Sequence, residues 1–326
     1  MTLRRIALLL AVIVVTVILA YELRVHIFLA DHSFPELIEL APAHSTFIAY
    51  VDLAELRKEP LIGHLAALAE PVVVDPDYQQ FISSTGFDYQ RDLDQVVIAA
   101  TADEKLAIAD GRFDRKKIEE YALRSGTIEQ RNGHTVYVMK SKMPGQAISL
   151  TFLGAHRIVL GEGGDFIGYL SSPRAPLDPA MRQRLSRVAG SPAFAGWKIP
   201  DSLTHGADQT GSFTVPALQS LRGIDLAIKP DGDRLLISAE GECDDPPQAQ
   251  SLSASLNFLR TILPAGLTGP STGPRKTPKT RGQMSAENAA LAARLAEATE
   301  ITTNNDRVRL LLTVSPDMIG GSAPTK

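Results

Sequence analysis

Residues 96–109 have the sequence VVIAATADEKLAIA. The apolar segments at 96–100 and 106–109 flank a short polar turn at 102–104, and this pattern predicts a β-hairpin. Further hairpins are predicted at residues 127–139, 224–241 and 299–314. Antiparallel hairpins that alternate with helical segments are typical of an α+β fold, whereas a doubly wound α/β sheet would need strand–helix alternation throughout.

Helices are predicted where an aspartate precedes an apolar-periodic segment, because its carboxylate caps the free N–H groups of a helix N-terminus. Asp52, Asp114, Asp178 and Asp245 each stand in this position. Leucines recur at helical spacing after Asp245, which predicts a long helix. Residues 264–283, rich in Pro, Gly, Thr, Lys and Arg, are predicted to be a mobile insertion behind it.

The two halves of the chain share a pattern of hairpin, G-x-x-D turn and helix. The turn has the sequence GRFD at residues 111–114 and GECD at residues 241–244. We therefore expect two antiparallel-sheet and helix lobes. A diverged internal duplication would explain them, and it predicts that Cys243 occupies the position of Phe113 and points into a core.

An uncharged apolar segment, IALLLAVIVVTVILAY, occupies residues 6–21 and follows two arginines. As a helix it would be roughly 24 Å long, close to the thickness of a bilayer core, and it continues apolar on one face to residue 29. The segment predicts a transmembrane signal anchor with its N-terminus in the cytoplasm. The anchor and topology residues are Arg4, Arg5, Ile6, Leu10, Val14, Ile18 and Tyr21.

Two alternatives to the anchor stay open, a cleaved signal peptide and a buried core helix. Cleavage favours small residues in an A-x-A pattern, and the best candidate, Ile18-Leu19-Ala20, has a bulky first residue. The predicted organisation is a cytoplasmic N-terminus (1–5), the anchor (6–21), a stalk (22–41), a first lobe (42–172), a connecting helix (173–190), a second lobe with the insertion (191–319) and a tail (320–326).

The composition excludes some classes of protein. The net charge of −4 argues against nucleic acid as a partner, because such proteins need a basic face. Cys243 is the only cysteine, so no disulfide can form within the chain. Its acidic neighbours disfavour a thiolate, so a buried core thiol is expected rather than a nucleophile.

No motif of the sequence predicts catalysis, a metal or a cofactor. Gly161-Glu162-Gly163-Gly164 lacks the further glycine of a dinucleotide loop, so we interpret it as a strand-to-helix turn, with a weak anion site as the alternative. The histidines show no metal-ligand spacing. They are His26, His32, His44, His64, His134, His156 and His205.

Two charged groups have open alternatives. Asp88, Asp92 and Asp94 are interpreted as a solvated turn, with a cation or peptide contact as the alternative. The basic residues of the insertion are expected to be solvated or to touch anionic lipid or an envelope polymer. They are Arg275, Lys276, Lys279 and Arg281.

Four short segments stand out between residues 40 and 170: Ala41-Pro42-Ala43, FIAYVDL at 47–53, Thr85-Gly86-Phe87-Asp88 and Asp92-Leu93-Asp94. In these segments residues 40–170 resemble a group of uncharacterised bacterial membrane-anchored proteins. The resemblance implies an anchored body, but no activity and no functional residue.

The leading hypothesis is a single-pass protein of the inner membrane whose body lies in the periplasm or cell exterior. There it would bind a partner protein or an envelope component, with no cofactor. The alternatives are an envelope hydrolase or transferase with a dispersed active site, and a structural envelope element.

Overall fold

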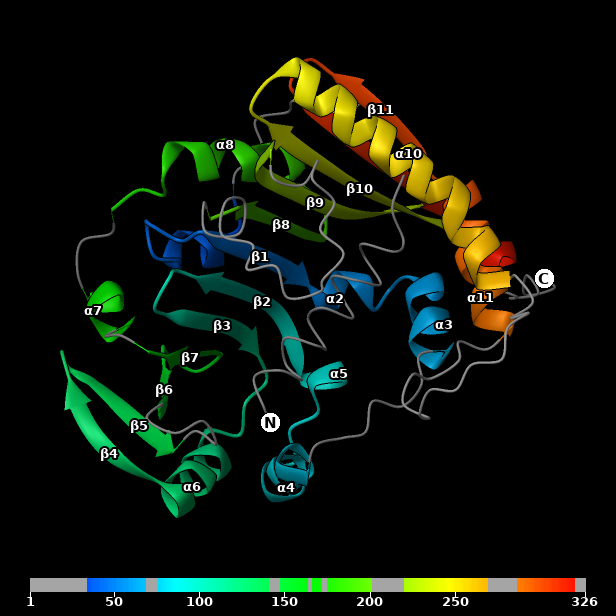
Figure 1. Ribbon diagram of the computed structural model, residues 1–326. Helices are drawn as coiled ribbons and strands as arrows, with labels where there is room; N and C mark the ends of the chain where they lie inside the picture. The colour runs from blue at the N-terminus through cyan, green and yellow to red at the C-terminus, as the bar shows by residue number, and fades with distance from the viewer. Residues whose placement is uncertain are drawn as a thin grey trace, which may run out of the picture.

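The computed structural model describes residues 34–68, 76–140, 147–163, 166–171, 175–200, 220–268 and 286–319. Within these residues the chain forms one continuous sheet of 12 strands, in the order β11-β12-β10-β9-β8-β1-β2-β3-β7-β6-β5-β4. All of the strand pairs are antiparallel. Figure 1 shows β4 and β11 at the two ends of the curved sheet.

The strands are β1 (Phe47–Asp52), β2 (Leu93–Ala100), β3 (Lys105–Gly111), β4 (Gly126–Arg131), β5 (His134–Lys140), β6 (Ala147–Phe152), β7 (Arg157–Glu162), β8 (Ala193–Lys198), β9 (Leu221–Asp231), β10 (Arg234–Cys243), β11 (Glu300–Asn304) and β12 (Arg307–Val314). The helices are η1 (Glu36–Leu40), α2 (Leu53–Leu56), α3 (Pro60–Leu68), α4 (Pro76–Thr85), α5 (Tyr89–Asp92), α6 (Arg115–Ser125), α7 (Phe166–Ser171), α8 (Pro179–Val188), α10 (Pro246–Thr268), α11 (Ala286–Glu297) and η3 (Pro316–Ile319).

The α+β class is confirmed, but the prediction of two lobes is wrong. The strands before and after the expected boundary at 173–190 belong to the same sheet, because β1 pairs with β8 as well as with β2. The sequence pattern marks hairpins, which pair neighbouring strands, and carries no signal for a pairing between strands far apart in the chain. The chain therefore has one sheet where two were expected.

The prediction of a transmembrane helix is also corrected. In the ranges described above, no helix is both long enough and apolar enough to cross a bilayer. The expected span at residues 6–21 lies outside the described residues. The same holds for the expected stalk up to residue 33.

The β1–β8 pairing joins the two halves of the sheet. Its register runs from Phe47 opposite Trp197 to Val51 opposite Ala193. The backbone N–H of Asp52 extends the pairing by donating to the Pro192 carbonyl at 2.6 Å. Side chains reinforce the pairing, because the ring centroids of Tyr50 and Phe194 lie 5.2 Å apart.

Helices cover both faces of the sheet. We call one face the α8 face. On it, Ile48, Val97 and Ile108 are fully buried in a core that is completed by η1, α7 and α8. We call the opposite face the α10 face. It packs against α3, α4, α6, α10 and α11. Because successive residues of a strand point to opposite faces, each central strand supplies apolar side chains to both cores.

The strand order repeats on either side of the β1–β8 pair. In one half, β1 is followed by the β2–β3 hairpin, and after α6 the chain returns so that β7 pairs with β3. In the other, β8 is followed by the β9–β10 hairpin, and after α10 and α11 the chain returns so that β12 pairs with β10. This shared plan accounts for the hairpin–helix pattern that recurs in the sequence.

The predicted helix starts are confirmed by hydrogen bonds. The carboxylate of Asp52 accepts from the Glu55 N–H at 2.8 Å, and that of Asp114 accepts from the Lys117 N–H at 3.2 Å. Asp178 and Asp245 cap α8 and α10 in the same way. These caps work because a short carboxylate satisfies N–H groups that have no partner inside the helix.

Two local predictions have different outcomes. The hairpin predicted at residues 127–139 is confirmed, and its turn residues, Asn132 and Gly133, both have the positive φ (50° and 80°) of a tight hairpin turn. The insertion does not begin at residue 264, because α10 continues to Thr268. The basic residues at 275–281 lie outside the described residues.

We predict that Gly111→Ala destabilises the fold. A Cβ at Gly111 would lie 2.3 Å from the Asp92 carbonyl oxygen, so the strand pair between β2 and β3 would have to move apart. The expected loss is about 1–3 kcal/mol of unfolding free energy, measured by urea titration. Gly63→Ala is the control, because its Cβ meets nothing within 4 Å and alanine favours α3. Equal effects of the two substitutions would contradict the prediction.

Candidate functional site

The histidines that the structure describes lie on different segments and do not form a common site. His44 is exposed behind η1, His134 begins β5, and His156 is exposed in the β6–β7 turn. Among the residues that the structure describes, no group of three or more His, Cys, Asp or Glu side chains is placed to hold a metal ion. His26, His32 and His205 lie outside the described residues.

The acidic residues at 88–94 serve separate structural roles. Asp88 caps α5 by accepting from the Gln90 N–H at 3.0 Å. Asp94 forms an ion pair of 2.7 Å with Arg57, whose guanidinium also donates to the Leu93 carbonyl. The sequence brings these carboxylates near one another, but each has its own partner.

Asp92 is the buried member of this group, with 8% of its surface exposed. Its carboxylate accepts from Arg91 Nη2 at 2.6 Å and from the Asp88 N–H at 3.0 Å, and Arg112 lies 3.8 Å away. Hydrogen bonds from Arg91 and from the Asp88 backbone lower the pKa of Asp92 to about 2. The residue thus links the two ends of α5 to each other and to Arg112, which follows β3.

In the glycine-rich segment at 161–164, the backbone at Gly163 passes close to the backbone of Asp103. Gly163 has a φ of 80°, and a Cβ there would lie 2.3 Å from the Asp103 carbonyl oxygen. The missing side chain lets the β2–β3 turn pack against the end of β7. Gly164 lies outside the described residues.

Cys243 is fully buried at the end of β10, as expected for a core thiol. It packs with Leu221, Ala249 and Leu252 on the α10 face. Burial raises the pKa of the Cys243 thiol, which keeps it protonated. Phe113, at the corresponding turn of the other half, is only partly buried and stacks on Phe87.

A charged cluster lies beneath α8, on the α8 face, and was not predicted. We call it the α8 cluster, and its members are Arg184, Arg187, Asp225, Glu240, Glu242 and Arg307. At its centre, Arg187 donates from Nε and from Nη2 to the two oxygens of Asp225, each at 2.8 Å. The Asp225 side chain is 1% exposed. Burial raises the pKa of Asp225, and the Arg187 guanidinium opposes that rise.

Two glycines let α8 approach the sheet. A Cβ at Gly196 would lie 3.1 Å from side-chain atoms of both Met181 and Leu185. A Cβ at Gly223 would lie 2.2 Å from Arg184 Nε. Arg184 is 5% exposed, and its Nε and Nη1 have no hydrogen-bond partner, while Nη2 is 3.4 Å from Glu242. The arrangement docks the helix on the sheet.

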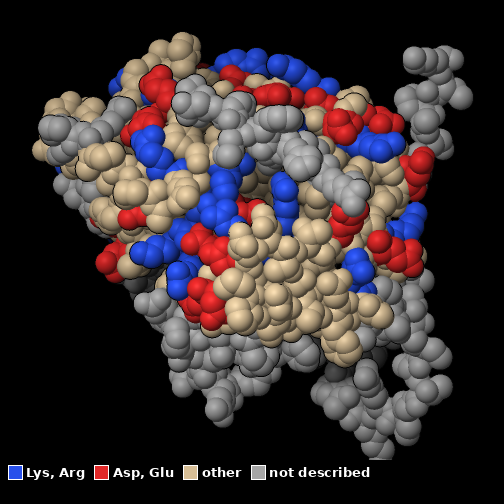
Figure 2. Space-filling model, turned by 90° about the horizontal axis from the view of Figure 1, so that it is seen from above, with Lys and Arg blue, Asp and Glu red and all other residues tan. Residues whose placement is uncertain are grey.

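The exposed side chains of α10 that the structure describes are all uncharged. Arg260, the one charged residue in the sequence of this helix, is partly buried and donates to the Thr299 carbonyl. The inner residues of α10, Ala249 and Leu252, are buried against the sheet. Its exposed residues are Pro246, Pro247, Gln250, Ser251, Ala254, Phe258 and Thr261. From Pro247 onward they follow helical spacing along one side, and Phe258 is 64% exposed. Figure 2, which looks down on the end that carries α8 and α10, shows a broad uncharged area over α10.

A signal for this surface was present in the sequence. Residues 246–259 contain leucines at helical spacing and no Lys, Arg, Asp or Glu. A surface helix of a soluble domain normally has charged residues opposite its apolar face. The absence of charge beside a leucine stripe therefore marks a helix with a second face that can be covered.

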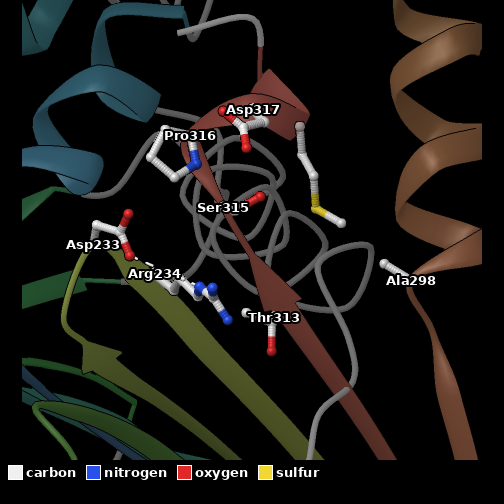
Figure 3. Close-up of a pocket in the computed structure, with 8 residues that line it drawn as sticks. Asp233, Arg234, Ala298, Thr313, Ser315, Pro316 and Asp317 are labelled. Carbon is white, nitrogen blue, oxygen red and sulfur yellow. Dashed lines mark ion pairs between the residues drawn. The ribbon is translucent and has the colours of Figure 1, made fainter. Parts of the chain in front are cut away.

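A pocket of about 350 Å³ lies at the end of the sheet where β10 begins and β12 ends. Its lining comes from separate segments and could not be predicted from a local pattern. The lining residues are Asp233, Arg234, Ala298, Thr313, Ser315, Pro316, Asp317 and Met318. Figure 3 shows the Arg234 side chain extending toward Thr313, with Ser315 between them and Pro316.

We predict that Asp92→Asn lowers stability at neutral pH but not at low pH. The folded pKa of about 2 lies below the ordinary value of 3.8, so the carboxylate stabilises the fold above about pH 4 and loses this effect as the pH falls toward 2. The loss at pH 7 should be about 1 kcal/mol, because solvent screens part of the ion pair. Urea unfolding of both proteins at pH 7 and below pH 3 measures it; a difference that does not depend on pH would contradict it.

The Arg187–Asp225 pair should behave as a coupled buried pair. Arg187→Met leaves the Asp225 carboxylate buried without its cation, so we expect a loss of about 3–5 kcal/mol. Adding Asp225→Leu should restore at least half of this loss. Arg182→Met, on the same helix but in a pair with Glu39 that is 42% exposed on both sides, should change stability by less than about 1 kcal/mol. Urea unfolding of the wild type, Arg187→Met, Asp225→Leu, the double variant and Arg182→Met tests this, and additive effects of the Arg187 and Asp225 substitutions would contradict the coupling.

Comparison with known proteins assigns no family. A scan against protein-family models gives no match, and a search of curated proteins gives none. Among solved structures, crystal form III of TP0453 is similar with a TM-score of 0.45 and 13% identity, over 86% of this chain and 94% of that chain. Crystal form IV of the same protein gives a TM-score of 0.44 at 13% identity, over 88% and 95%. At these values the similarity supports no argument about function.

Proposed function

We propose that the protein is a non-catalytic binding protein that recognises a partner protein through the outer face of α10. The observation that carries this proposal is the exposed Phe258 on a helix face without charge. Exposed apolar surface on a folded protein often marks a protein–protein interface, and aromatic side chains commonly anchor such interfaces. The partner is expected to offer an apolar groove that accepts one side of a helix.

The position of α10 supports this proposal. The helix is fixed from below by Ala249, Leu252 and Leu256, and its packing partner α11 holds it from the side. Asp245 caps its N-terminus through the Gln248 N–H at 2.9 Å. A helix held in this way presents its outer face without an ordering cost on binding.

The arginines with short ion pairs take no part in the proposed contact surface. Arg57, Arg91, Arg157 and Arg187 each form an ion pair of 2.9 Å or less with a nearby carboxylate. The pairs of Arg57, Arg157 and Arg187 connect different elements of the fold, whereas Arg91 pairs with its neighbour Asp92 within α5. An uncharged contact surface is compatible with them, because it needs none of these groups. A location outside the cytoplasm stays a prediction from residues 6–21.

Substitution of Phe258 tests the proposal. Tagged wild-type protein, Phe258→Glu and Leu123→Glu are used for affinity capture from detergent-solubilised cells. Leu123 is the matched control, because it is 45% exposed but lies on α6. A specific partner should be retained by the wild type and by Leu123→Glu and lost by Phe258→Glu.

The captured protein is then purified and titrated against all three proteins. We expect Phe258→Glu to weaken binding roughly 30-fold, as for an aromatic anchor of an interface. Equal affinity of wild type and Phe258→Glu would overturn the assignment of this face. Turnover of an envelope polymer by the wild type would favour the hydrolase alternative.

A further inference from the structure

We infer that two copies of this chain associate through the outer edge of β4. The contact uses none of the residues of α10, so it goes beyond the proposed function. β4 is the last strand at one end of the sheet, and among the described residues no strand pairs with its outer side. Figure 1 shows this edge at the end of the sheet that lies far from α10. An uncovered edge strand can pair with a strand of a second chain.

Every second residue of β4 directs its backbone groups away from the sheet. Arg131 and His134 flank the two-residue turn of the β4–β5 hairpin, so they exchange both of their backbone hydrogen bonds. Hydrogen-bonded and non-hydrogen-bonded pairs alternate along an antiparallel ladder. The N–H and C=O groups of the non-hydrogen-bonded residues therefore point outward. These residues are Gly126, Ile128 and Gln130.

The other edge of the sheet, β11, differs from β4. α10 packs against β11, and the exposed residues of β11 are polar. On β4, by contrast, Ile128 is 49% exposed. Folded proteins commonly protect an edge strand with a proline, a lysine or a bulge. β4 contains no proline and no lysine, and its pairing with β5 is regular. The edge of β4 is therefore the better site for a further strand.

The further strand is β4 of a second copy, because β4 is complementary to itself. A contact between two copies related by a two-fold axis must match its own rotated image. The outward-facing residues are centred on Ile128, so only an axis at Ile128 gives all three of them a partner. Ile128 then lies opposite Ile128 of the second copy, and Gly126 lies opposite Gln130. The two Ile128 side chains form an apolar cross-strand pair.

The charges of β4 are compatible with this arrangement. Glu129 and Arg131 form an ion pair of 2.6 Å within the strand, so each copy brings a strand without net charge. With the axis at Ile128, Glu129 lies opposite Thr127, and among the residues of β4 no like charges face each other. An axis at Glu129 would instead set two carboxylates opposite each other, which destabilises a strand pair.

Sedimentation of the full chain in detergent tests the association. We expect a monomer–dimer equilibrium with a dissociation constant of roughly 10–100 μM, because a contact of one strand on each copy is smaller than a standard interface. Ile128→Pro should weaken it at least about tenfold, since proline lacks the outward N–H but leaves the bonds to β5 in place. Thr303→Pro is the matched control, because Thr303 has the corresponding outward position on β11. A monomer throughout this range, or a dimer that Ile128→Pro leaves unchanged, would overturn the inference.

Disulfide cross-linking gives a second readout that does not depend on how proline is tolerated. Cys243 is buried, so a cysteine introduced on β4 is the accessible thiol. A mixture of Thr127→Cys and Glu129→Cys should form mainly the mixed dimer on mild oxidation, because these positions face each other across the axis. Thr302→Cys, exposed on β11, should stay monomeric.

Three outcomes of the cross-linking would overturn the inference. The first is the absence of any cross-linked dimer. The second is a Glu129→Cys protein that cross-links to itself faster than to Thr127→Cys, since this would exclude the axis at Ile128. The third is cross-linking in cells to a different protein alone, which would assign the edge of β4 to another partner.

Discussion

The pairing of β1 with β8 is the interaction on which the rest of the structure depends. Without it, each half would expose the unpaired N–H and C=O groups of an edge strand, which is a site for aggregation. The pairing satisfies these groups from Phe47 opposite Trp197 to Val51 opposite Ala193. It also places the apolar residues of both halves on common faces, so the core that contains Ile48 and Phe194 crosses the joint.

The second constraint is the docking of α8 over this joint. Gly196 and Gly223 let the helix approach the sheet, and the Arg187–Asp225 pair holds it there through two hydrogen bonds of 2.8 Å. A buried ion pair contributes little net stability, because desolvation offsets its attraction, but loss of one partner is costly. The pair therefore specifies where the helix sits. The charges of this pair are occupied in that role.

Local features could be predicted well because their causes are local. A capping carboxylate such as Asp114 acts on N–H groups within three residues, and Asn132-Gly133 forms a tight turn by its own backbone preference. The acidic group at 88–94 shows the limit of such reasoning. The neighbouring positions of these carboxylates suggest a shared site, yet Asp92 forms ion pairs with Arg91 and Arg112, whereas Asp94 forms one with Arg57.

The sequence by itself determined the α+β class, the hairpins, the capped helices and the burial of Cys243, because periodicity, turn residues and caps act over a few positions. Only the tertiary structure decided that there is one sheet and not two, since β1 meets β8 across more than 140 residues of chain. It likewise decided the α8 cluster and the pocket lined by Arg234 and Thr313, whose members come from separate segments. Pairing between distant strands depends on which edges and apolar faces remain to be covered after the local elements have formed, and no short sequence pattern records that.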